Sequence, residues 1–166
     1  MRVELFAVGG IVRDHLIGVK SKDVDLSCVV TGGSTDPLLA LDELAAVLDA
    51  QGFEVFVTTP DKFTCRAKVP RDHPIAKWGS NTADFVLARK DGPYSDGRRP
   101  DFVEIGTFED DIARRDFTVN ALAVAAGVIE EDGSFTDPIF IPGTGESMDE
   151  HVIDLHGGLD DLARRE

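Results

Sequence analysis

The predicted fold rests on one stretch, Val8-Gly-Gly-Ile-Val-Arg-Asp-His-Leu-Ile-Gly-Val-Lys-Ser-Lys-Asp-Val-Asp-Leu26. The apolar residues 5–8 are typical of a short strand, and the apolar residues of 11–17 recur at helical spacing. Gly9 and Gly10 join these two elements. Because glycine has no side chain and a helix start exposes unpaired N–H groups, this turn predicts a phosphate-binding site. A plain tight turn is the alternative.

Arg13 lies three residues into the predicted helix, where its planar guanidinium can bind the same anion through paired donors. Further along, apolar residues alternate from Val24 and predict a strand. Alternation places Asp23 and Asp25 on one face of that strand, about 6–7 Å apart. Two carboxylates this close repel each other unless a cation such as Mg²⁺ lies between them. A solvated strand edge is the alternative, but the glycine pair and Arg13 favour a metal site.

A second predicted strand, residues 82–89, carries a further carboxylate. Asp84 shares one face with Val86 and Ala88. If this strand is the neighbour of the first, Asp84 lies beside Asp23 and Asp25. Three carboxylates could then hold two metal ions and leave one group to take a proton from an attacking hydroxyl.

Residues 110–122 combine charge with apolar side chains. The apolar side chains from Ile112 to Val124 have helical spacing, which predicts a helix, and an ordinary charged helix face is the simplest interpretation. Alternatively, Arg115 supplies a second cation to a triphosphate. Asp116 would then hold that arginine in place, and Asn120 would add a polar contact.

Local signals predict the remaining elements. Asp36 is the expected N-cap of an amphipathic helix. Residues 90–100 are rich in turn formers, and they form either an ordinary surface loop or a mobile flap that closes on substrate. The other expected elements are a helix at 37–50, strands at 53–58 and 62–69, a loop at 71–81, a hairpin within 127–154, a strand at 152–155 and a helix at 157–166.

Composition narrows the class of protein. The chain has 166 residues, of which 42% are hydrophobic, so it fits one compact domain. No apolar run approaches a membrane span, and no Cys/His cluster has zinc spacing. Cys28 and Cys65 fall within predicted strands and are expected to be buried free thiols, which indicates a reducing, cytoplasmic location. The net charge of −14 disfavours nucleic-acid binding outside the basic regions 62–77 and 89–99.

The chain resembles the catalytic head of class II CCA-adding enzymes and bacterial poly(A) polymerases, within the DNA polymerase β-like nucleotidyltransferases. Four motifs carry the resemblance, in the family's order and over nearly the whole chain. They are Val8-Gly-Gly-Ile-Val-Arg-Asp14, Lys22-Asp-Val-Asp-Leu26, Arg114-Arg-Asp-Phe-Thr-Val-Asn-Ala-Leu122 and Asp154-Leu-His-Gly-Gly-Leu-Asp-Asp-Leu162.

The resemblance implies an α+β fold with a mixed β-sheet and helices packed on one side. It also implies transfer of a nucleoside monophosphate from ATP or CTP to an RNA 3′-hydroxyl, most readily that of tRNA, with release of pyrophosphate. Mg²⁺ would be bound by Asp23 and Asp25, with Asp84 as a third active-site carboxylate. The nucleotide contacts it implies are Gly10, Arg13 and Arg115.

The family's head is followed by a helical neck that reads the base, and by body and tail domains that hold tRNA. Residues 1–166 correspond to the head, so these further domains are expected to be absent and the RNA contacts to come from outside the chain. The alternatives are an NTP-binding module that needs a partner or an oligomer for turnover, a nucleotidyltransferase acting on a protein or small molecule, and a structural protein that kept only the fold.

Overall fold

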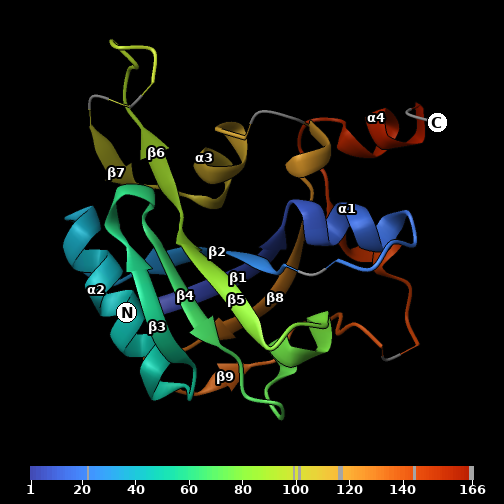
Figure 1. Ribbon diagram of the computed structural model, residues 1–166, viewed down its shortest axis with the longest axis horizontal. Helices are drawn as coiled ribbons and strands as arrows, with labels where there is room; N and C mark the ends of the chain where they lie inside the picture. The colour runs from blue at the N-terminus through green and yellow to red at the C-terminus, as the bar shows by residue number, and fades with distance from the viewer. Residues whose placement is uncertain (22, 99, 101, 116–117, 144, 165–166) are drawn as a thin grey trace.

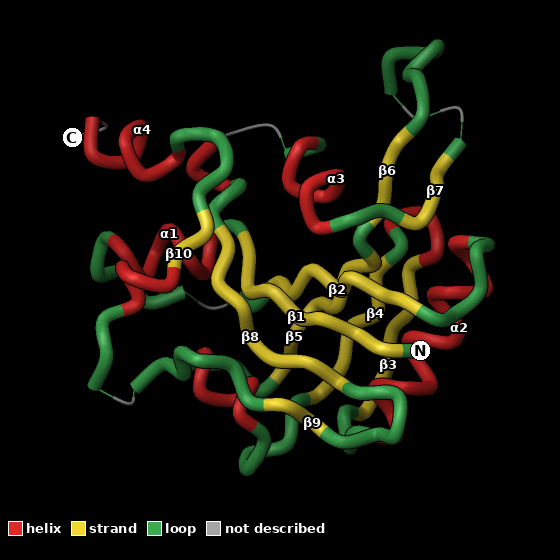
Figure 2. Tube along the Cα trace, turned by 180° about the vertical axis from the view of Figure 1, so that it is seen from behind, coloured by secondary structure: helices red, strands yellow, loops and turns green. Residues whose placement is uncertain are grey.

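The computed structural model describes residues 1–21, 23–98, 100, 102–115, 118–143 and 145–164, with only the backbone of residue 119. Its centre is an eight-stranded sheet in the order β10-β8-β1-β2-β5-β4-β3, and β9 pairs with β8 (Figures 1 and 2). Strands β2 and β5 run parallel, and the other described neighbours pair antiparallel, so the predicted mixed sheet is confirmed. The strands are β1 (Arg2–Val8), β2 (Asp25–Thr31), β3 (Glu54–Thr59), β4 (Thr64–Lys68), β5 (Thr82–Leu87), β8 (Ala123–Ile129), β9 (Phe135–Thr136) and β10 (Val152–Ile153).

Helix α2 (Pro37–Ala50) has the bounds that the local signals predict. The Asp36 carboxylate accepts hydrogen bonds from two backbone N–H groups of the first turn, and a proline follows it. Three leucines at helical spacing are fully buried against the sheet, and each contributes about 1.5–3 kcal/mol by leaving water. They are Leu41, Leu44 and Leu48.

One face of the sheet therefore carries the main core. Helix α1 (Gly10–Leu16) adds Ile11 and Val12 to the same core as α2. Strand residues that point to this face alternate with residues that do not, as a pleated sheet requires. On β2, Leu26 and Cys28 face the core, whereas Asp25 faces the other way. The expected packing of helices on one side holds for these two helices.

Helix α3 (Phe108–Ala113) lies against the opposite face. It belongs to a second apolar cluster that includes Val8 and Ile112, and the rings of Phe6 and Phe108 are 4.3 Å apart. Thr107 and Asp110 form a capping box that fixes the start of this short helix. The open face is thus covered at one end only, and the rest of it is free to hold a site.

The helix predicted from the apolar spacing between Ile112 and Val124 is wrong. Helix α3 ends at Ala113, a 3-10 turn covers Thr118–Asn120, and β8 begins at Ala123. Ile112 belongs to the second cluster, whereas Leu122 and Val124 belong to the main core on the other face of the sheet. An apolar run such as Ala121 to Ala126 fits a buried strand as well as a helix, and pairing with β1 determines the outcome.

The rest of the chain follows the predictions closely. Strands β8 and β9 form the expected hairpin, and β10 and helix α4 (Gly158–Arg164) form the last two elements. The Asp154 carboxylate accepts from the first two backbone N–H groups of α4. The predicted loop at 71–81 contains a 3-10 helix, Pro74–Trp78, and Trp78 is packed in the core.

A two-stranded ribbon, β6 (Arg89–Asp91) and β7 (Val103–Ile105), projects from the sheet (Figure 1). The start of the predicted flap, residues 90–100, is therefore paired, and its middle joins the two strands. Cys28 and Cys65 are buried free thiols, as predicted, and burial raises the pKa of both. Within the described ranges, no helix is long and apolar enough to cross a membrane.

Candidate active site

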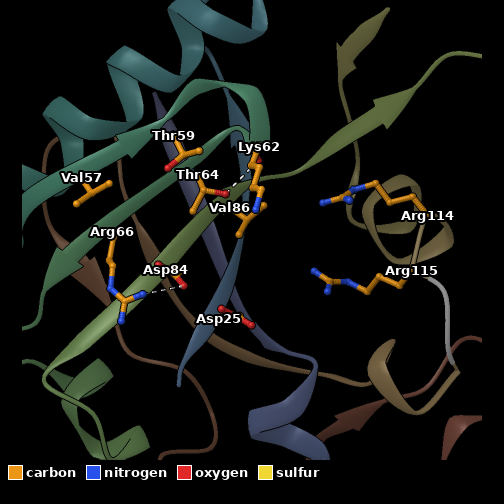
Figure 3. A pocket seen from close by; sticks show the side chains of 10 residues that line it. All are labelled: Asp25, Val57, Thr59, Lys62, Thr64, Arg66, Asp84, Val86, Arg114 and Arg115. Carbon is orange, nitrogen blue, oxygen red and sulfur yellow. Dashed lines mark hydrogen bonds and ion pairs between the residues drawn. The ribbon is translucent and has the colours of Figure 1, made fainter. Parts of the chain in front are cut away.

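A cavity of about 410 Å³ opens on the face of the sheet opposite to α2 (Figure 3). The strands β2, β4 and β5 form its floor, and the segment that follows α3 forms one wall. Although the whole chain is acidic, four of the side chains around this cavity are basic and two are acidic. The lining residues are Asp25, Val57, Thr59, Lys62, Thr64, Arg66, Asp84, Val86, Arg114 and Arg115.

The two acidic side chains lie side by side. Asp25 is the first residue of β2, and Asp84 is its register partner in the parallel strand β5. Both are partly buried. Burial raises the pKa of Asp25, and the neighbouring charge of Asp84 raises it further, while Arg115 and Arg66 act in the opposite direction. The expected adjacency of these two carboxylates is therefore present, and their mutual repulsion favours a bound cation.

Asp23 lies just before the strand to which the sequence assigns it. It is exposed, because β1 ends at Val8, opposite Asp25, and the chain then turns at Gly9 into α1. Val24 is buried in the main core and its carbonyl accepts from the backbone N–H of Asp84, so the alternation of buried and less buried residues continues back to Asp23. The charge of Asp23 also raises the pKa of Asp25, less than burial and the charge of Asp84 do.

The donor set fits a Mg²⁺ ion that is shared with a substrate. Among the described residues, no three Asp, Glu, His or Cys side chains are grouped closely enough to enclose a metal. Mg²⁺ usually keeps several waters and binds through one or two carboxylates together with substrate phosphates. Asp25 and Asp84 provide that pair of hard oxygen ligands at the floor of an open cavity.

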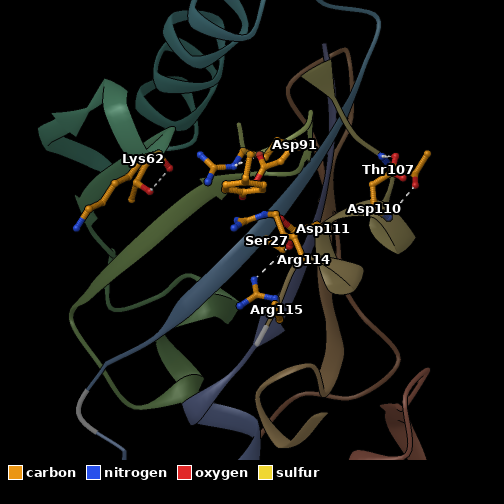
Figure 4. Close-up of polar contacts among 11 residues, drawn as sticks. Ser27, Lys62, Asp91, Thr107, Asp110, Asp111, Arg114 and Arg115 are labelled. Carbon is orange, nitrogen blue, oxygen red and sulfur yellow. Dashed lines mark hydrogen bonds and ion pairs between the residues drawn. The ribbon is translucent and has the colours of Figure 1, made fainter. Parts of the chain in front are cut away.

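Two guanidinium groups face the carboxylates from the segment after α3 (Figure 3), and Figure 4 shows their contacts with Asp111. Arg114 and Arg115 each donate to the carboxylate of Asp111, over 3.1 Å in both cases, and Ser27 Oγ donates to it over 2.9 Å. Asp111 is completely buried. This carboxylate therefore fixes both arginines against β2 and points them to the cavity. The Nε of Arg115 is buried and has no hydrogen-bond partner among the described residues.

The glycine turn adjoins the same arginine. Gly9 has φ 73°, a conformation that favours glycine, and a Cβ at this position would lie 4.0 Å from Nη1 of Arg115. Arg13 packs over Gly10 and donates from Nη1 to Oδ1 of Asn120 over 3.0 Å. The structure thus brings together Gly9, Gly10, Arg13, Arg115 and Asn120, all of which the sequence predicts as nucleotide contacts.

Two features of the site were not predicted. Asp116, the expected partner of Arg115, lies outside the described residues, and Asp111 has that role among the described ones. Asp111 lies three and four residues before the two arginines. Residues at these spacings are neighbours on a helix, so the sequence could have indicated this contact. Arg66 was also missed, although alternation along β4 places it on the same face as Thr64.

A mixed sheet whose open face carries paired carboxylates, with guanidiniums opposite and a glycine turn beside them, defines the nucleotidyltransferase class of fold. Comparison with known proteins agrees. Residues 5–166 match the poly A polymerase head domain family. The chain is 31% identical over 170 residues to the multifunctional CCA protein of Cupriavidus necator, and 32% identical over 164 residues to the CC-adding tRNA nucleotidyltransferase of Deinococcus radiodurans.

The chain belongs to the poly A polymerase head domain family. Each of the two alignments covers 98% of this chain, but only 30% and 34% of those longer relatives. Two solved structures share the fold. One is a tRNA-processing enzyme with CTP, with a TM-score of 0.51 at 26% identity, covering 97% of this chain and 31% of that one. The other is the Bacillus stearothermophilus CCA-adding enzyme with CTP, with a TM-score of 0.58 at 22% identity, covering 98% and 28%.

Proposed function

We propose that the protein transfers a nucleoside monophosphate from ATP or CTP to the 3′-hydroxyl of an RNA, tRNA first among them, and releases pyrophosphate. The observation that carries this proposal is the register pairing of Asp25 with Asp84 opposite Arg115, which adjoins the glycine turn. The names of the relatives support the same reaction and the same acceptor. The two buried free thiols support a place in the reducing cytoplasm.

The residues divide into two groups. Asp25 and Asp84, with Asp23 just before β2, would hold Mg²⁺, which when bound neutralises phosphate charge and makes the acceptor hydroxyl more acidic. Arg115 and Arg13 bind the phosphates of the nucleotide beside the Gly9-Gly10 turn. Asn120 adds a polar contact and, in our proposal, Asp116 helps to hold Arg115 in place. These groups orient the triphosphate so that its α-phosphate faces the carboxylates.

The reaction then needs one proton transfer and one displacement. A carboxylate of the pair takes the proton of the acceptor 3′-hydroxyl, whose oxygen forms a bond to the α-phosphorus. The bond between the α-phosphorus and the bridging oxygen breaks on the opposite side. Pyrophosphate leaves with that electron pair, and Arg115 and Arg13 stabilise its charge.

The body of a tRNA needs more contacts than this acidic chain offers. With a net charge of −14, the surface as a whole repels nucleic acid. The cavity differs from the rest of the surface, because four basic side chains line it. We infer that parts outside these 166 residues, a protein partner or a second copy provide the remaining tRNA contacts.

Replacing Asp25 with Ala tests the proposal. We expect incorporation of labelled ATP or CTP into tRNA to be lost while the far-UV circular dichroism spectrum is unchanged. Asp42→Ala is the matched control, because this carboxylate is exposed on α2, on the other side of the sheet. Full incorporation by Asp25→Ala would refute the proposal. A panel of RNA, protein and small-molecule acceptors identifies the substrate. If the protein binds NTP but releases no pyrophosphate with any acceptor, it is a module that depends on a partner.

A further inference from the structure

Basic side chains lie on two sides of the carboxylate pair. Arg114 and Arg115 reach the cavity from the segment after α3, and Arg66 reaches it from β4 (Figure 3). Asp25 and Asp84 lie between these two groups. The cavity is therefore cationic at both ends and anionic in the middle, which suits two separate phosphate-bearing molecules that meet over the carboxylates.

The geometry of phosphoryl transfer distinguishes the two ends. The attacking oxygen and the leaving oxygen lie roughly in line on opposite sides of the phosphorus. Arg115 adjoins the Gly9-Gly10 turn, so the end that it occupies belongs to the nucleotide and its leaving pyrophosphate. The attacking hydroxyl must then approach from the other end, where Arg66 lies.

The side chain of Arg66 is suited to a phosphate that arrives from solvent. Its Nη1 is 3.7 Å from Oδ2 of Asp84, and the arginine side chain is 44% exposed. An exposed ion pair of this kind contributes little to stability, so the guanidinium can exchange its partner at small cost. A guanidinium also matches phosphate oxygens bidentately.

One neighbour completes this end of the cavity, and a further cation lies along the lining toward Arg114 (Figure 3). Val57 is the register partner of Arg66 on β3, is 46% exposed and offers an apolar contact for a ribose or base. Lys62, in the 3-10 helix Pro60–Lys62 between β3 and β4, adds a second exposed cation to the lining. An apolar contact beside an exposed cation is a suitable surface for the end of a single RNA strand.

We propose that Arg66, with Val57, forms the acceptor subsite, which binds the last phosphodiester of the RNA 3′ end and places the terminal hydroxyl at Asp84. This inference rests on the proposed function. It assigns the two cationic groups to different substrates: the arginines after α3 to the nucleotide, and Arg66 to the RNA.

The test measures RNA binding and nucleotide binding separately. The probe is a fluorescent RNA hairpin with a single-stranded end that terminates in a 3′-deoxynucleotide, so that turnover is not needed. For Arg66→Ala we expect RNA affinity to fall about tenfold or more, as for a lost charged hydrogen bond. The slope of log affinity against log salt should become shallower by about 0.7, which corresponds to one lost single-strand phosphate contact. The affinity for CTP, measured by calorimetry, should not change.

Lys68→Ala is the matched control. Lys68 is exposed on the same face of β4, two residues beyond Arg66 and outside the cavity lining, so its loss should leave RNA binding intact. Three results would overturn the subsite. Arg66→Ala could bind RNA as tightly as the unaltered protein, or Lys68→Ala could lose as much RNA affinity as Arg66→Ala. The third is that Arg66→Ala loses affinity for CTP and keeps its affinity for RNA. If the unaltered protein transfers nucleotides to RNA in those cases, the proposed function stands without the subsite. If it neither binds nor extends RNA, both fail.

Discussion

Asp111 offers the sharpest test of how the site is built. Replacing it with Asn keeps the shape but removes the charge that Arg114, Arg115 and Ser27 share. Removing one partner of a buried ion pair costs about 3–5 kcal/mol, since the remaining charge is left without its partner. The two arginine side chains keep 24% and 19% exposure, so water offsets part of that loss. We therefore expect the lower end, a loss of about 3 kcal/mol in the free energy of unfolding.

For a chain of this length, that loss lowers the melting temperature by about 6–12 °C. Nucleotide binding should weaken as well, because Arg115 is no longer fixed beside the glycine turn. A lost charged hydrogen bond corresponds to about 10- to 100-fold in affinity. Thermal unfolding and calorimetric titration with CTP measure the two effects. Glu109→Gln, an exposed change on the same helix, is the control. An unchanged melting temperature would refute this role of Asp111. A lower melting temperature together with an unchanged affinity for CTP would also refute it.

Two further predictions concern His73 and Asn120. Burial lowers the pKa of His73 below its ordinary value of 6.5, so below pH 6.5 the unfolded chain takes up a proton that the folded chain does not. The contribution of His73 to the free energy of unfolding is therefore complete above pH 6.5 and falls as the pH drops. The variant His73→Asn can still accept from the Ile75 N–H but does not titrate. Urea unfolding at a series of pH values should therefore show a flatter dependence of stability on pH for this variant. A slope equal to that of the unaltered protein would contradict this. Asn120→Ala removes the acceptor that holds Arg13, so we expect CTP affinity to fall by about three- to tenfold, consistent with the loss of one hydrogen bond, with little change in stability. A large loss of stability with full CTP affinity would count against the role of Asn120.

The elements that the sequence predicts best are those that local chemistry defines. Helix α2 begins after Asp36 because a capping carboxylate and a proline precede a run of apolar residues at helical spacing, and nothing distant is needed. The same is true of the glycine turn and α1. Alternation also predicts which face of β5 carries Asp84, although only the parallel pairing of β2 with β5 brings Asp84 to Asp25.

The errors arise where distant pairing overrides local pattern. The residues after Ala121 have apolar spacing that fits a helix, but they pair with β1 and become β8. Asp23 lies just before β2, because the register with β1 and β5 begins at Asp25, and the residues around Asp23 do not reveal where those distant strands start and end. Asp111 could not be identified as buried, because burial of a charge depends on Ser27, 84 positions earlier in the chain, lying beneath it.

The central claim is that the carboxylates of β2 and β5 and the arginines after α3 form one site for a metal-bound nucleotide. The most direct test is calorimetric titration of the unaltered protein and Asp25→Asn with CTP and ATP, in Mg²⁺ and in EDTA. The account predicts that the unaltered protein binds nucleotide more tightly in Mg²⁺ than in EDTA. In Asp25→Asn this difference should disappear, because the amide no longer attracts the cation. Equal affinity with and without Mg²⁺, or the same Mg²⁺ dependence in Asp25→Asn, would contradict the account.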